Sequence, residues 1–163
     1  MKKISFNPFD PKSVSKAIKE LDEYKKWIKE KSKLLSEKLA EIGLATASLH
    51  FETAIYDGDN DTVVTAEPTK NGWKIVAEGQ SVCFIEFGSG VIGEGHPDAS
   101  KYGMGVGTWS ESESGKGHWN DPNGWYYAHG QKSFGNPPAM AMWEAQKEMK
   151  QRIENVAKEV FKI

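Results

Sequence analysis

The chain contains 163 residues, which is enough for a single domain with a modest hydrophobic core. Its net charge is −2, and it has only one arginine, Arg152. This balance argues against a general or sequence-specific nucleic-acid-binding protein. Binding to the phosphate backbone favours a clear basic excess, and arginine is the usual bidentate ligand of phosphate and guanine.

The single cysteine and the amino-terminal residues predict the compartment. Cys83 cannot form an internal disulfide, and its apolar neighbours predict a buried, unreactive thiol. Residues 1–5 carry charge without the apolar segment of a signal peptide, and no apolar run approaches the length of a membrane span. We therefore expect a protein that assembles in a reducing cytoplasm and has no membrane partner.

Charge is distributed unevenly along the chain. Residues 1–47 carry a net charge of +4, residues 48–100 carry −7, and residues 101–163 carry +1. A basic end followed by an acidic middle suits self-association in which opposite charges meet. A solvated basic helix beside an acidic loop region would give the same pattern, so both interpretations stay open.

Residues 1–9 are expected to form an arm, followed by a long amphipathic helix over residues 10–43. Asp10 is a good N-cap, Pro11 suits the first helical position, and Gly43 is a plausible stop. Apolar residues then recur every seven positions: Val14, Leu21, Ile28, Leu35 and Ile42. A helix of about thirty residues is on the order of 45 Å long, too long for a domain this small to cover. Part of it either projects toward a neighbouring subunit or forms a hairpin with the last helix.

Residues 45–87 are expected to form an antiparallel β meander. Strands are predicted over residues 49–56, 62–65, 73–77 and 82–87, from alternation and turn residues between them. The pair Asn71-Gly72 is a strong hairpin signal.

The last part of the chain is expected to contain a long glycine-rich loop over residues 88–124 and a short return strand over 125–134. A helix over 136–161 follows, with Asn136 as its cap and two prolines in its first turn. The chain as a whole (1–163) thus predicts one α+β domain in which the carboxyl-terminal helix packs on the sheet.

Three patterns suggest chemistry, and each lacks a required feature. A zinc site would draw on residues in or near the loop: His96, Asp98, His118, Asp121 and His129. None of these residues has a helical i, i+4 ligand pair or a known zinc motif. Asp57, Asp59 and Asp61 have calcium-loop spacing, but Thr62 and Pro68 replace the expected Gly and Glu. A Cys83–His nucleophile pair would need a reactive thiol. We therefore expect no metal, no cofactor and no catalytic residue.

Aromatic residues are the stronger signal in the second half of the chain. They are Trp109, Trp119, Trp125, Tyr126 and Tyr127. Aromatic residues on loops supply large contact areas and are typical interface anchors. A sugar-binding surface would use the same residues, and so would a small second core beneath the loop.

Two motifs carry a resemblance to a known family. The first is Phe84-Ile85-Glu86-Phe87-Gly88-Ser89-Gly90, and the second is Gly135-Asn136-Pro137-Pro138-Ala139-Met140, which precedes the last helix. Together they resemble small neck proteins of tailed phages, the head–tail connector or tail-completion proteins. That family has a strand ending in Glu-Phe-Gly, a variable insertion, and a proline-containing entry to the carboxyl-terminal helix.

The resemblance implies a structural virion protein and not an enzyme. It implies a homo-oligomeric ring, hexameric or dodecameric, that contacts the tail tube protein on one face and a head-completion or adaptor protein on the other. Glu86, Phe87 and Gly88, with the five loop aromatics, are then candidate partner-binding residues. The resemblance does not separate a tail terminator from a head-side connector. The alternatives are a carbohydrate-binding module that uses Trp109, Trp119 and Trp125, and a zinc hydrolase built from the histidines.

Overall fold

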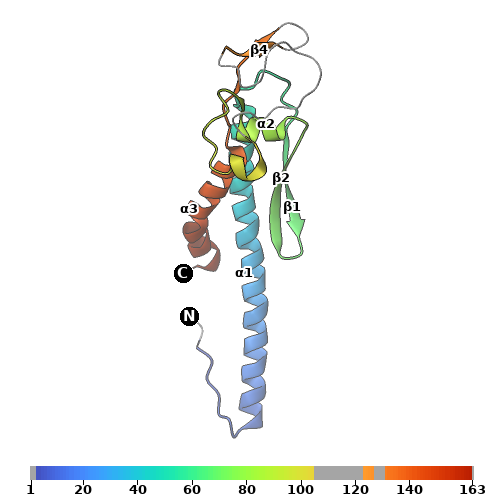
Figure 1. The fold of residues 1–163 in the computed structure, drawn as a ribbon. Coiled ribbons are helices and arrows are strands. Elements are labelled where there is room, and N and C mark those ends of the chain that lie inside the picture. The colour runs from blue at the N-terminus through green and yellow to red at the C-terminus, as the bar shows by residue number, and fades with distance from the viewer. Residues whose placement is uncertain (1–2, 105–122, 127–130, 163) are drawn as a thin grey trace.

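A computed structural model describes residues 3–104, 123–126 and 131–162 of the chain (Figure 1). Its longer elements are helix α1 (Pro11–Glu52), strands β1 (Val63–Thr69) and β2 (Gly72–Glu78), and helix α3 (Ala141–Phe161). The shorter ones are helix α2 (Val82–Phe87), a 3₁₀ turn (Ala99–Tyr102), and the strands β3 (Ser89–Gly90), β4 (Trp125–Tyr126), β5 (Lys132–Ser133) and β6 (Gly135–Asn136). The predicted α+β class is confirmed.

Helix α1 begins where the sequence predicts and ends later than predicted. The Asp10 side chain accepts a hydrogen bond from the backbone N–H of Lys12 at 3.0 Å, and Pro11 occupies the first turn. The prediction that Gly43 ends the helix is wrong, as is the strand predicted over residues 49–56. The helix runs on to Glu52, and its 42 residues make it about 63 Å long.

Gly43 is buried inside α1, and two other elements pack where its side chain would otherwise lie. A Cβ atom at this position would collide with Ile75 of β2 and would lie 2.7 Å from the sulfur of Met149 of α3. The hairpin and α3 therefore meet over the backbone of Gly43. Close approach, and not helix termination, accounts for this glycine.

The predicted hairpin is confirmed, but the meander is not. β1 and β2 pair antiparallel with Thr69 opposite Gly72, so that Lys70 and Asn71 form a two-residue turn. The strand predicted over residues 82–87 is instead the short helix α2, and the sheet stops at two strands. Cys83 lies on the exposed side of α2, so the predicted buried thiol is also wrong.

The region predicted as one return strand, residues 125–134, instead contains two short strands, β4 and β5, and β6 follows it. β4 pairs with β5, and β6 pairs with β3, both antiparallel. Within the predicted loop over residues 88–124, the described part contains β3 and the 3₁₀ turn. The rest of that loop, residues 105–122, lies outside the described residues.

Helix α3 begins at Ala141, so Pro137 and Pro138 precede it, and Asn136 does not cap it. It runs antiparallel to α1 and packs mainly on that helix, with the hairpin on the other side of α1 (Figure 1). Met149 of α3 and Ile75 of β2 both lie over Gly43 of α1. The small core joins the carboxyl-terminal end of α1, α2 and the start of α3 through Phe51, Ile85 and Ala141. We call this end of the molecule the head.

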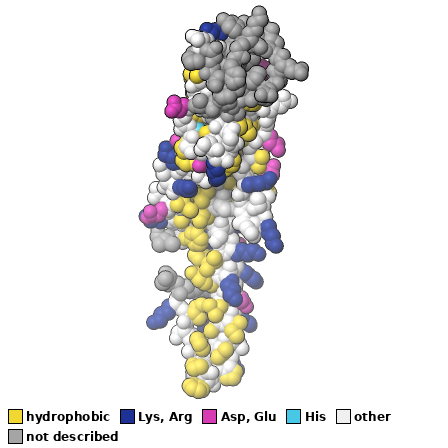
Figure 2. Space-filling model, viewed as in Figure 1, with side chains coloured by type: hydrophobic (Ala, Val, Ile, Leu, Met, Phe, Trp, Pro, Cys, Tyr) yellow, Lys and Arg dark blue, Asp and Glu magenta, His cyan; other side chains and the backbone are white. Residues whose placement is uncertain are grey.

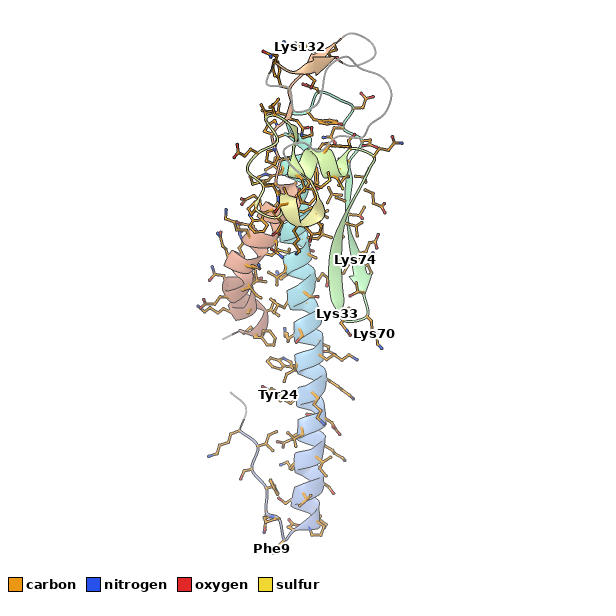
Figure 3. The ribbon with its side chains drawn as sticks, viewed as in Figure 1. Phe9, Tyr24, Lys33, Lys70, Lys74 and Lys132 are labelled. Carbon is orange, nitrogen blue, oxygen red and sulfur yellow. The ribbon has the colours of Figure 1, made fainter. Side chains whose placement is uncertain are left out.

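The first half of α1, residues 11–31, extends beyond both neighbours. The hairpin reaches α1 at Ser36, close to Gly72, and the last turn of α3 places Phe161 edge-on against Trp27. Beyond Trp27, the arm of residues 3–10 turns at Phe9 and runs back beside the helix (Figures 1 and 3). Part of α1 thus projects beyond the hairpin and α3, and the helical hairpin with α3 reaches back to Trp27. That the projecting part meets a neighbouring subunit stays a prediction.

Candidate functional site

The two sequence motifs lie together at the head, joined through the buried side chain of Glu86. The Oε2 atom accepts a hydrogen bond from the backbone N–H of Met142 at 2.9 Å, and Oε1 accepts one from Trp143 at 3.1 Å. These N–H groups begin α3 and have no partner within the helix. Glu86 therefore caps α3 from another element, and its negative charge stabilises the positive end of the helix dipole.

His96 completes the hydrogen bonding of Glu86. Its Nδ1 atom accepts from the backbone N–H of Asp98 at 3.1 Å, so Nε2 carries the ring hydrogen and donates it to Glu86 at 3.3 Å. The imidazole also packs edge-on between the rings of Phe87 and Trp143. With these fixed donors the Glu86 carboxylate holds α2, the start of α3 and His96 together.

Backbone and amide hydrogen bonds extend the same connection. The carbonyl groups of Ile85 and Glu86 accept from the N–H groups of Ala139 at 2.8 Å and Met140 at 3.2 Å. The Asn136 side chain donates to the Phe84 carbonyl at 2.8 Å and accepts from the Ser89 hydroxyl at 2.5 Å. The end of α2 and the entry to α3 therefore form one polar unit, which we call the motif lock.

At Gly88 in the motif lock there is no room for a side chain. Its φ of +77° is in the left-handed region, where a side chain is strained. A Cβ there would lie 2.9 Å from both the Pro138 nitrogen and the Gly93 Cα, which are backbone atoms. Gly88 therefore ends α2 in a conformation that favours glycine. The expectation that Glu86 ends a strand is wrong, because it lies in α2 and is buried.

An apolar groove of 630 Å³ opens beside the motif lock. Its walls come from α1, β2 and α3, with Leu39, Trp73 and Met149 among the lining residues, and Tyr102 lies at its edge near Phe87. Glu86 and Phe87, two of the predicted partner-binding residues, line it as well. The indole N–H of Trp73 is buried and has no hydrogen-bond partner among the described residues.

Only part of the predicted aromatic site belongs to the described residues. Trp125 and Tyr126 form β4, next to β5 at the far end of the head (Figure 1). Trp109, Trp119 and Tyr127 lie outside the described residues. Whether these aromatics act together, with each other or with Glu86 and Phe87, stays a prediction.

Neither metal alternative gains support from the described residues, none of which form a cluster of three possible metal ligands. His96 is held by Glu86, whereas His118, Asp121 and His129 lie outside the described part. Among the calcium-loop candidates, Asp61 accepts hydrogen bonds from the backbone N–H groups of Gln80 and Ser81, and Asp57 accepts one from the Ser133 hydroxyl. These aspartates thus hold neighbouring chain segments.

Two surfaces expose apolar side chains, and neither was singled out as a site from the sequence. One is the first half of α1 with the arm, where Phe9, Ile18 and Leu21 are exposed. The other is the segment from the end of α1 to β1, where Leu49, Ile55 and Val63 are exposed. The heptad pattern in the sequence indicates the first surface. The sequence does not indicate the second surface, because its pattern predicts a strand over residues 49–56.

The sequence matches no protein-family model and no curated protein, and the fold matches no solved structure. Among the described residues, no helix is long and apolar enough to span a membrane.

Proposed function

We propose that this protein is a structural component of a tailed-phage neck. It forms a homo-oligomeric ring, hexameric or dodecameric, that completes the phage tail and joins it to the phage head. Its other partners are the tail tube protein and a head-completion or adaptor protein, and it acts in the virion after assembly in the bacterial cytoplasm.

The observation that carries this proposal is the motif lock. The resemblance rests on two short motifs far apart in the sequence, and such motifs arise easily by chance when they are unrelated in space. Here hydrogen bonds of Glu86 and Asn136 connect the first motif to the second motif and the start of α3. This is expected if the two motifs form one structural unit that holds the ends of an insertion. The insertion between them, which begins at Gly88, is then the element available to a partner.

The exposed half of α1 gives independent support for an assembly role. Monomeric proteins rarely leave large apolar side chains partly exposed in a row along a long helix. Ile18, Leu21, Tyr24, Trp27 and Ile28 are all partly exposed along this half of the helix. A subunit that packs on a neighbour would cover them.

The test is the mass of the purified protein by light scattering over a wide concentration range, followed by electron microscopy. The proposal expects a species near six or twelve times the chain mass of 18.1 kDa, with ring-shaped particles. A mass of 18.1 kDa at every concentration, together with binding to glycans, would favour the carbohydrate-binding alternative and count against the ring. Deletion of residues 100–118 should leave a folded protein that no longer assembles into particles.

A further inference from the structure

The first half of α1 forms a basic surface that also exposes apolar side chains. Residues 11–31 contain seven lysines and four acidic residues. Lys12, Lys16 and Lys19 lie together on one side of the helix. Ile18, which is 53% exposed, lies instead with Val14 and Leu21 beside Ile4 and Phe6 of the arm. Phe9, at the turn before the helix, is 93% exposed (Figure 3). Figure 2 shows hydrophobic side chains gathered at this end of the molecule, with Lys and Arg on both flanks further along. Among the described residues, only Lys25 in this half makes a salt bridge.

A second surface has the opposite charge and the same apolar character. Residues 49–63 contain four acidic residues and no lysine or arginine. Ile55 is 73% exposed, and Leu49 and Val63 are exposed by more than half. Glu52 and Asp59 are exposed and make no salt bridge within the described part of the chain. We call residues 11–31 with Phe9 the basic surface and residues 49–63 the acidic surface.

These surfaces cannot meet within one molecule. Both Ile18 and Glu52 belong to the unbroken helix α1, and their separation of 34 positions corresponds to about 51 Å at 1.5 Å per residue. Any contact between the basic and acidic surfaces must therefore join two copies of the chain.

We infer that the basic surface of one copy docks on the acidic surface of the next copy. A symmetric dimer through the basic surface would place lysines against lysines, and one through the acidic surface would place carboxylates against carboxylates. Like charges in contact oppose association, whereas basic on acidic favours it and sets the register. The exposed apolar residues in each surface supply the area that becomes buried.

This arrangement is a heterologous interface, in which two different surfaces meet. In each contact a copy uses one of its surfaces and keeps the other free for a further copy. Heterologous interfaces close into rings when the rotation between copies divides a full turn, and otherwise give open filaments. The inference rests on the self-association in the proposed function and specifies its interface.

Site-specific cross-linking tests the pairing directly. Cys83→Ser removes the single native thiol, and Ile18→Cys and Ile55→Cys are then introduced in separate chains. A bis-maleimide reagent should link the two variants when they are mixed and should link neither variant to itself. Ile153→Cys is the matched control, since Ile153 is 48% exposed but lies on α3, outside both surfaces. Links within either single variant, or equal links to Ile153→Cys, would overturn the inference.

Charge reversal gives a second, reversible readout. Lys16→Glu with Lys19→Glu, and Glu52→Lys with Asp59→Lys, should each weaken self-association by about tenfold or more, and mixing the two reversed proteins should restore it. Unchanged association of both reversed proteins would overturn the interface while leaving the ring intact. A wild-type protein that stays at 18.1 kDa at every concentration would overturn the ring and the interface together.

Discussion

The head and the first half of α1 differ in how far their side chains find hydrogen-bonding or packing partners within the chain. At the head, the carboxylate of Glu86, the ring of His96 and the amide of Asn136 all have partners from other segments. Along the first half of α1, apolar side chains such as Ile18 and Leu21 are left partly exposed, with only the arm beside them. These polar side chains of the head thus find their partners within the chain, whereas the first half of α1 leaves apolar area that the proposed neighbouring subunit would cover.

Glu86→Ala should have the largest effect, because it breaks the motif lock. The change leaves the N–H groups of Met142 and Trp143 without an acceptor at a buried helix start, and it removes the partner of His96. We expect a loss of about 4 kcal/mol in the free energy of unfolding, measured by chemical denaturation. Glu86→Gln keeps an acceptor oxygen and should cost clearly less. Equal losses in the two variants would show that packing, and not capping, is the role of this side chain.

Gly88→Val should be the next largest, because it introduces a side chain into a left-handed turn against backbone atoms. We expect about 3 kcal/mol of destabilisation from strain and collision, measured in the same way. Gly103→Ala is the matched control: Gly103 also has a positive φ, of +67°, but nothing lies within 4 Å of its missing Cβ. It should cost only about 1 kcal/mol. A similar loss at both positions would remove the close approach from the explanation.

Leu21→Ser should affect folding little and association strongly. Leu21 is nearly half exposed, so its replacement should lower the free energy of unfolding by about 1 kcal/mol or less. Ile85→Ala at the head, where the side chain is fully buried, should cost about 3 kcal/mol. Denaturation curves for the isolated chains and light scattering for their assembly separate the two effects. A large loss of stability in Leu21→Ser would contradict the contrast drawn between the two regions.

Asp61 should give the smallest effect, which is present at neutral pH and is lost in acid. Hydrogen bonds from the backbone N–H groups of Gln80 and Ser81 lower the pKa of Asp61 below its ordinary value of 3.8. A lowered folded-state pKa stabilises the folded protein above the unfolded-state value, and this stabilisation is lost as the pH falls through the folded-state pKa. The difference in melting temperature between the wild type and Asp61→Ala should therefore be constant near neutral pH and shrink below about pH 4. A difference that does not change with pH would rule out this linkage.

Local signals in the sequence predicted the elements that depend on neighbouring residues. Asp10 and Pro11 located the start of α1, and Asn71-Gly72 located the hairpin, because caps and tight turns are decided within a few residues. The α+β class followed from these elements.

The wrong predictions concern features decided by distant residues. The apolar run that forms α2 is too short for its periodicity to separate a helix from a strand. Gly43 reads as a helix stop until Ile75 and Met149 are known to pack over it. Glu86 acts on N–H groups 56 and 57 positions away, and no local pattern in the sequence indicates such a cap. Of the candidate site, therefore, the motifs were predictable but their connection was not.

The unbroken helix α1 also fixes the spacing and the rotational phase between the two ends of the subunit. An insertion of seven residues near the middle would lengthen the helix by about 10 Å and rotate its ends by only about 20°, since seven residues are close to two turns. An insertion of five residues would lengthen it less but rotate the ends by about 140°. If α1 spans neighbouring subunits, the helix acts as a molecular ruler. Particle dimensions would then follow its length, and particle closure would depend on its phase.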